Sequence, residues 1–207
     1  MLHRLLSRRR PLLQELQRYD WKKLRALKHY TLGEESAESI PGGIAALAAA
    51  RDKEEAERFY WQIDHHAVFN EVIAESALPT VRCVLAALHA CTEVARPFLL
   101  EVLVEIGGGQ PSEAELKHGN RGLAEACRRE LCYGAALFFH LLENGTHHER
   151  YCCIDLLGLC AEADPHIRER TIWWFEKLLA ESEAGTDASV PNNAEFLQNW
   201  LKELEKG

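Results

Sequence analysis

Residues 156–164 read LLGLCAEAD, and residues 44–52 read the similar sequence IAALAAARD. Each stretch leads into a helix-like segment that carries an arginine and, three residues later, a tryptophan. The matching residues, all 112 positions apart, are Leu47 with Leu159, Asp52 with Asp164, Arg58 with Arg170 and Trp61 with Trp173. Three units of about 37 residues would fill this interval, and that length is typical of helix-pair repeats. The sequence therefore predicts a fold assembled from repeated helical hairpins.

Helix signals extend along most of the chain, and no segment has the sustained apolar–polar alternation that predicts a strand. An N-cap side chain is followed three residues later by a glutamate at Asp52, Ser112, Thr146 and Asn192, a spacing that satisfies backbone N–H groups at helix starts. Some of the longer helices are expected to break in two. The expected helices lie at residues 11–19, 20–30, 41–51, 53–66, 69–90, 92–106, 112–118, 121–143, 147–162, 165–182 and 193–205.

The segment 151–182 resembles a HEAT-type repeat. It contains residues 156–159 (LLGL), residues 164–168 (DPHIR) and an apolar run to residues 178–179 (LL). Such a repeat consists of a helix, a tight turn with an aspartate, and a second helix that opens with an aliphatic–arginine pair. The resemblance implies an all-α fold, an α-solenoid of antiparallel HEAT-like helix pairs in a right-handed superhelix. The unit at 44–66 departs from the pattern, so the number of repeats stays open.

Two segments are expected within a single domain overall. Residues 1–30 are predicted to be basic N-terminal capping helices, and residues 31–207 are predicted to be the HEAT-like solenoid. The apolar side chains that would cover the open end of the solenoid are Leu5, Leu12, Leu13, Leu16 and Trp21. The alternative role for this segment is contact of the arginines at 8–10 with a membrane surface or nucleic acid.

A longer stretch resembles bacterial HEAT-like proteins. The resemblance is carried by Trp61, Phe69, Pro79, residues 97–100 (PFLL) and residues 119–120 (GN). Some relatives of that kind are immunity proteins encoded beside polymorphic or contact-dependent toxins. The resemblance implies a non-catalytic module that binds a cationic toxin domain, often a nuclease, and covers its substrate groove. A general protein-interaction scaffold is the nearest variant, and a second copy of the chain is another partner that the sequence leaves open.

Charge is distributed unevenly along the chain. Residues 1–28 carry nine basic and two acidic side chains, a net charge of +7, whereas residues 29–207 carry 15 basic and 30 acidic ones, a net charge of −15. The acidic part repels phosphate backbones and speeds encounter with a basic protein. The rival hypothesis is a HEAT-like enzyme similar to the alkylpurine DNA glycosylases, in which Trp61, Trp173 and Trp174 would surround a damaged nucleotide.

Motifs that would indicate catalysis or a metal are incomplete. Residues 64–66 (DHH) match the triplet of a metal-dependent phosphoesterase family, but that chemistry needs further aspartates on a parallel sheet. Residues 147–149 (HHE) supply one His-Glu dipeptide, where HEAT-like di-iron hydroxylases use several. Glu115 and His118 lack a second copy, and the cysteines and histidines between residues 127 and 160 lack zinc-knuckle spacing. We therefore expect no catalytic residue, cofactor or metal.

The cysteine pattern and hydropathy bear on location. Seven cysteines without the spacing of a disulfide framework favour a reducing compartment. No stretch approaches the roughly 20 apolar residues of a membrane-spanning helix. A cytoplasmic protein without a membrane partner is expected.

Two equivalent helix faces each present a tryptophan among charged residues. Tryptophan and arginine dominate binding hot spots, and a row of glutamates that includes Glu93 could form the wall of a site for a basic partner. The residues predicted to bind the partner are Glu57, Arg58, Trp61, Asp64, Glu101, Glu105, Glu169, Arg170, Trp173 and Glu176. In the alternative interpretation, each indole fills a gap between repeats.

Overall fold

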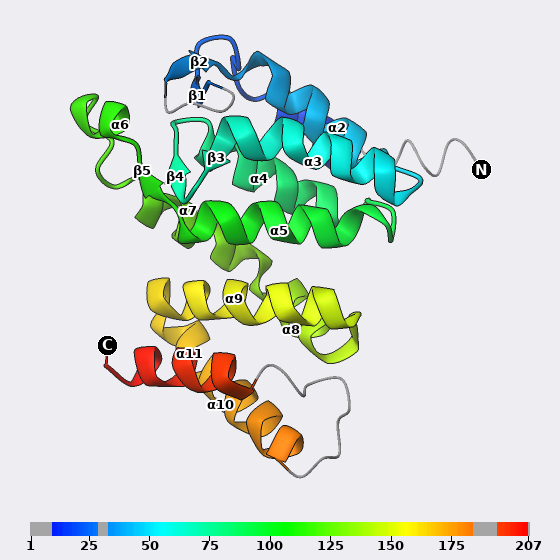
Figure 1. The fold of residues 1–207 in the computed structure, drawn as a ribbon, viewed down its shortest axis with the longest axis vertical. Coiled ribbons are helices and arrows are strands. Elements are labelled where there is room, and N and C mark those ends of the chain that lie inside the picture. Colours follow the sequence, from blue (N-terminus) through cyan, green and yellow to red (C-terminus); the bar gives the residue numbers. More distant parts are fainter. Residues whose placement is uncertain (1–9, 29–32, 184–193, 207) are drawn as a thin grey trace. The chain divides into compact units, whose positions relative to one another are not determined.

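A computed structural model describes residues 10–28, 33–183 and 194–206 of the chain (Figure 1). These residues are mostly helical, so the expected all-α class is confirmed in its coarse form. The chain divides between Glu130 and Leu131 into two compact units, each with its own set of packed helices.

The centre of the first unit consists of α2 (Ile40–Ala49), α3 (Lys53–Ala67), α4 (Ala77–Leu88) and α5 (Ala95–Gly108). Helix α3 lies between α2 and α5, and α4 packs against both α2 and α5 (Figure 1). The short helix α6 (Glu113–Lys117) and helix α7 (Leu123–Leu131) follow. The fully buried core side chains include Ile44, Leu47, Ile63, Val84, Leu99 and Leu103.

An N-cap sets the start of α3, the helix that carries the candidate site. The Asp52 carboxylate accepts a hydrogen bond from the Glu55 backbone N–H at 2.9 Å and caps the helix, as the sequence predicted. Glu54 and Glu55 lie in the first turn, and His65 and His66 lie in the last. The acidic first turn suits the helix dipole, which favours anions at the N-terminus.

The expectation of no strands is wrong in the first unit. Strands β1 (Arg25–Leu27) and β2 (Glu34–Ser36) form an antiparallel pair. In a second small sheet, β3 (Val68–Phe69) is antiparallel to β4 (Val72–Ile73), and β4 is parallel to β5 (Gln110–Pro111). These strands have two or three residues each, too few for a pattern of alternation to be visible in the sequence.

A tight turn explains why the predicted helix over residues 69–90 begins only at Ala77. Asn70 and Glu71, which connect β3 and β4, have φ angles of 48° and 62°. Two successive residues with positive φ are typical of the two-residue hairpin turns that match the twist of the flanking strands. Asparagine tolerates this conformation, whereas a glutamate there is strained.

Tertiary contacts override the helix predicted over residues 20–30. The buried Trp21 indole donates a hydrogen bond to the Leu16 carbonyl at 2.8 Å. The Arg25 guanidinium donates to both carboxylate oxygens of Glu115, at 3.1 and 2.9 Å, and forms an ion pair with Glu75 at 3.1 Å. These contacts hold the chain in turns and in β1, because they require a backbone geometry that a helix does not have.

The N-terminal apolar residues differ in how far they are buried. Residues 10–16 are helical, and Leu12, Leu16 and Trp21 are buried. Leu13, by contrast, is exposed. Leu5 and the arginines at positions 8 and 9 lie outside the described residues.

The second unit contains α8 (Ala135–Asn144), α9 (His147–Ala163), α10 (Pro165–Glu183) and α11 (Ala194–Lys206). Helix α9 packs against the other three. The 3₁₀ turn η2 (Cys132–Gly134) separates α7 from α8, so the helix expected over 121–143 breaks in two.

The starts of α9 and α10 follow the sequence prediction. Thr146 and Glu149 form a complete capping box. The Asp164 carboxylate accepts a hydrogen bond from the His166 N–H at 2.8 Å, ahead of a helix that begins with a proline. The predicted N-cap at Asn192 lies outside the described residues.

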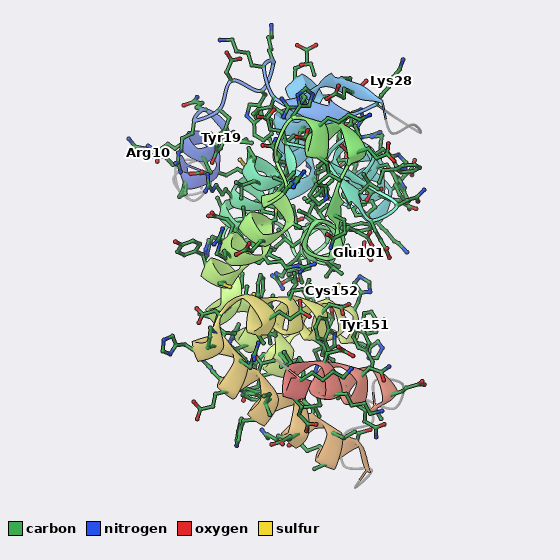
Figure 2. All side chains as sticks on the ribbon, turned by 90° about the vertical axis from the view of Figure 1, so that its left-hand side faces the viewer. Arg10, Tyr19, Lys28, Glu101, Tyr151 and Cys152 are labelled. Atoms are coloured by element: carbon green, nitrogen blue, oxygen red, sulfur yellow. The ribbon has the colours of Figure 1, made fainter. Side chains whose placement is uncertain are left out.

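Helix α11 packs on α9 through aromatic side chains. Tyr151, labelled on α9 in Figure 2, stacks on Phe196 of α11 with ring centroids 4.9 Å apart. The Trp200 indole donates a hydrogen bond to the Asp155 carboxylate at 3.0 Å. A Cβ at Gly158 would lie 2.4 Å from this indole, so the close approach of α11 requires glycine there.

Candidate functional site

Helices α3 and α5 bring acidic and aromatic side chains together in the first unit. We call this group the acidic–aromatic surface. Its members are Tyr60, Trp61, Asp64 and His65 on α3, Glu71 in the β3–β4 turn, and Phe98, Glu101 and Glu105 on α5. It forms because α3 packs directly on α5. Figure 2 labels Glu101 on α5.

The aromatic members form a connected row along α3. The Trp61 indole stacks on the His65 ring, one helical turn later, with centroids 4.9 Å apart and planes 22° apart. Tyr60 meets Trp61 edge-on at 4.9 Å and contacts Phe98 of α5 at 6.0 Å. Trp61 nevertheless remains 45% exposed. Stacking thus holds an indole in place while one part of it stays open to solvent.

Asp64 is a carboxylate in an unfavourable environment. It is only 8% exposed, and the Tyr60 hydroxyl lies 3.5 Å from its Oδ1. Burial and the nearby negative charges of Glu105 and Glu101 raise the pKa of Asp64 from its ordinary 3.8 to about 6, although the Tyr60 hydrogen bond acts in the opposite direction. Near neutral pH, Asp64 therefore carries a buried negative charge near Glu101 and Glu105, and the His65 Nε2 lies 3.6 Å from its Oδ2.

Glu105 experiences the same repulsion. Partial desolvation and the charges of Glu101 and Glu71 raise the pKa of the Glu105 carboxyl, although Glu105 is a solvent-exposed residue. Glu71 contributes its charge from a strained backbone position, with a φ of 62°. Its carbonyl accepts a hydrogen bond from Gln110 N–H at 2.7 Å, which holds the turn against β5. Strained residues often lie at functional sites, where the surrounding structure enforces them.

The structure brings four of the predicted partner-binding residues together: Trp61, Asp64, Glu101 and Glu105. Glu57 and Arg58 are exposed nearer the start of α3, where the Arg58 guanidinium lies 4.7 Å from the centre of the Phe59 ring.

Two details of the predicted α3–α5 surface are wrong. Asp64 was predicted to bind the partner from a charged helix face, but it is buried, as is the adjacent His65, because α5 packs beside them. Glu93 was expected on the same helix flank as Glu101, but it precedes α5, which begins at Ala95.

The four predicted residues of the second unit are all exposed on α10: Glu169, Arg170, Trp173 and Glu176. Trp173 is 56% exposed. The Arg170 guanidinium lies 4.0 Å from the centre of the Phe139 ring, and the Lys177 ammonium lies 4.6 Å from the Trp174 ring. On the same helix, Thr171, Phe175 and Leu178 are buried, whereas Ile167 and Trp174 are half-buried. Neither Trp61 nor Trp173 is wholly enclosed between helices.

Sequence reasoning missed Tyr60, His65, Glu71 and Phe98 as members of the acidic–aromatic surface. Tyr60 is buried, and its hydroxyl reaches Asp64 from the core. Burial, followed by the charge of Asp64, raises the pKa of Tyr60, so this hydroxyl stays protonated as a donor. The Asn70-Glu71 pair between the apolar residues 68–69 (VF) and 72–73 (VI) was the one available signal for Glu71.

Carboxylates beside an exposed indole are suited to binding organic cations. Carboxylates attract and hydrogen-bond lysine or arginine, and the indole face adds a cation–π interaction. Within the described ranges, no set of three or more His, Cys, Asp or Glu side chains is arranged to hold a metal ion. No helix among these residues combines the length and apolar character needed to cross a membrane.

Comparison with known proteins gave no match to a family model, a curated protein or a solved structure.

Proposed function

We propose that this chain is a non-catalytic protein-binding module whose acidic–aromatic surface binds basic side chains of another protein. The observation that carries the proposal is the buried Asp64 carboxylate beside Glu101 and Glu105, next to an exposed Trp61. Like charges gathered in this way destabilise the unliganded fold, and a cationic side chain would relieve their repulsion. Functional sites commonly retain such destabilising groups.

The overall charge supports the same kind of partner. Residues 29–207 carry a net charge of −15, which favours encounter with a basic protein and disfavours phosphate. The rival hypothesis, an enzyme of the alkylpurine DNA glycosylase kind, needs lysine or arginine for each phosphate contact. The acidic–aromatic surface presents carboxylates instead.

As the finer form of the fold, we propose an α-solenoid of antiparallel HEAT-like helix pairs. Two pairs support it, because α2 packs on α3 and α9 packs on α10, each across a short connection that ends in an aspartate N-cap. These pairs are the two that share the 112-residue offset in sequence.

As the biological form of the binding function, we propose an immunity protein that binds a cationic toxin domain in the cytoplasm and covers its substrate groove. The support is the acidic charge and the exposed Trp61 and Trp173, which are suited to hot spots in an interface.

A titration with hexalysine tests the surface directly. In a 15N-labelled sample, the indole N–H resonance of Trp61, identified with Trp61→Phe, is expected to shift. The buried Trp21 indole, which donates to Leu16, serves as the internal control and is expected to stay unchanged. The shift should weaken with added salt, with Glu105→Gln, and when hexaglutamate replaces hexalysine. No shift at Trp61, or a shift that Glu105→Gln leaves unaltered, would contradict the proposed surface.

Co-expression tests the immunity hypothesis. The product of an adjacent reading frame should be toxic alone and harmless beside this protein, and the two purified proteins should form a salt-sensitive complex. Trp61→Ala or Trp173→Ala should weaken the complex, whereas Tyr133→Ala, which removes an aromatic residue that is 83% exposed elsewhere, should not. Turnover of alkylated DNA by the purified protein would instead favour the enzyme hypothesis.

A further inference from the structure

Two cysteines of the second unit lie against each other. Cys132 opens the η2 turn and is half-buried, whereas Cys160 is buried in α9. The Cys132 thiol donates to the Cys160 carbonyl oxygen over 3.8 Å, and the two side chains also hydrogen-bond to each other. The Cys132 sulfur thus lies next to Cys160, as a bond between the two side chains requires.

The two thiols differ in a way that suits thiol–disulfide exchange. Their hydrogen bond lowers the pKa of Cys132, whereas the same bond, together with burial, raises the pKa of Cys160. The charge of Asp164 opposes the thiolate form of both. Cys132 is half-buried and Cys160 is buried, so an external disulfide reaches the Cys132 sulfur first, and Cys160 lies beside it as a resolving thiol.

From this geometry we infer that Cys132 and Cys160 are a reversible redox modification site, which a small disulfide such as oxidised glutathione converts into an intramolecular disulfide. The Cys132 thiolate attacks one sulfur of oxidised glutathione and releases one glutathione thiolate. Cys160 then loses its proton and attacks the Cys132 sulfur of the mixed disulfide, releasing the second glutathione. Two protein thiols are oxidised to one disulfide, and one glutathione disulfide is reduced to two thiols.

The other cysteines are less suited to this chemistry. Burial raises the pKa of Cys83 and Cys127 to about 12 and also raises that of Cys153, so none of these buried residues offers an accessible thiolate to attack an external disulfide. Cys152 and Cys153 are adjacent on α9, and neighbouring side chains on a helix do not face each other.

The bond would tie the first turn of the second unit to the end of α9. It would close a loop with 27 residues between the two cysteines, a segment that contains α8 and most of α9. A crosslink over such a loop restricts the unfolded chain, so oxidation is expected to raise the thermal stability of the second unit.

The test equilibrates the full-length protein with oxidised glutathione, traps remaining thiols with N-ethylmaleimide under denaturing conditions, and counts them by intact mass. The wild type should present two fewer than its seven thiols, with a peptide crosslink between Cys132 and Cys160, and glutathione in excess should restore all seven. Cys160→Ser should accumulate a glutathione adduct on Cys132, and Cys132→Ser should form neither product.

Two further variants keep the test decisive. Cys91→Ser, which removes a half-buried cysteine of the first unit, should behave as the wild type does. Cys160→Ala replaces Cys160→Ser if the serine variant fails to fold. Retention of all seven thiols by the folded wild type, or a crosslink between other cysteines, would overturn the inference.

Discussion

Asp64→Asn should make the protein more stable at neutral pH while weakening its binding to cations. Asparagine has the shape of aspartate and can accept the Tyr60 hydrogen bond, but it carries no charge. In the wild type the pKa of Asp64 rises from 3.8 to about 6 on folding. The native state therefore holds this proton more tightly than the unfolded chain does. The stabilisation that the native state gains from this tighter proton binding is fully present below about pH 4, and it is lost as the pH rises through 6.

The magnitude follows from the same two values. A difference of one pH unit in pKa corresponds to about 1.4 kcal/mol, so the ionised Asp64 destabilises the native state by roughly 3 kcal/mol at pH 7. Asp64→Asn should raise the free energy of unfolding by up to this amount at pH 7. The difference between variant and wild type should shrink toward zero at pH 4.

Urea unfolding at a series of pH values measures this difference. Glu57→Gln removes the same charge from an exposed position on the same helix, and it should change stability by no more than about 0.5 kcal/mol. In the hexalysine titration, Asp64→Asn should bind more weakly, with Glu113→Gln, an exposed position on α6, as the control. A variant that is no more stable than the wild type at pH 7, or whose advantage persists at pH 4, would refute the reasoning.

Three further substitutions probe other parts of the fold. Glu115→Gln should lower the free energy of unfolding by about 3 kcal/mol in urea, because it removes the buried partner of an arginine, whereas Glu113→Gln on the same helix should have little effect. Glu71→Gly should raise the melting temperature and stabilise the fold by about 1 kcal/mol, since it relieves both a positive φ and a repulsive charge; a loss of stability would contradict this. Gly158→Ala should destabilise the protein in calorimetry, because the added Cβ overlaps the Trp200 indole of α11. Gly42→Ala, where the added Cβ would have no other atom within 4 Å, should be neutral or slightly stabilising. Equal effects of the two substitutions would argue against the described packing.

Local signals allowed much of the helical structure to be predicted. The N-caps at Asp52, Ser112, Thr146 and Asp164 each act within three residues of their own helix, so the sequence alone reveals them. The strand over Arg25–Leu27 was missed because contacts with residues distant in the sequence hold it in place. The helix-pair solenoid and the immunity role remain predictions.

In the candidate site too, features that depend on one helix could be predicted from the sequence, whereas contacts between distant residues could not. Helical periodicity placed Trp61 among charged residues but left open whether the indole is exposed or fills a gap between repeats; in the structure it is 45% exposed. The proximity of Glu101 and Glu105 to Asp64 depends on the packing of α3 against α5, which periodicity within one helix cannot reveal. Periodicity placed Asp64 on a polar face, and the neighbouring helix buries it there.

The ion pair between Arg25 and Glu115 limits how far the protein can be shortened. Glu115 is 1% exposed and also accepts hydrogen bonds from the Glu75 N–H and the Asn120 amide, so its charge is committed to the interior. A fragment that starts after residue 30 would leave the buried Glu115 carboxylate without the Arg25 guanidinium. The segment that carries Arg25 therefore stabilises the interior of the first unit, and any search for a minimal binding fragment should retain it.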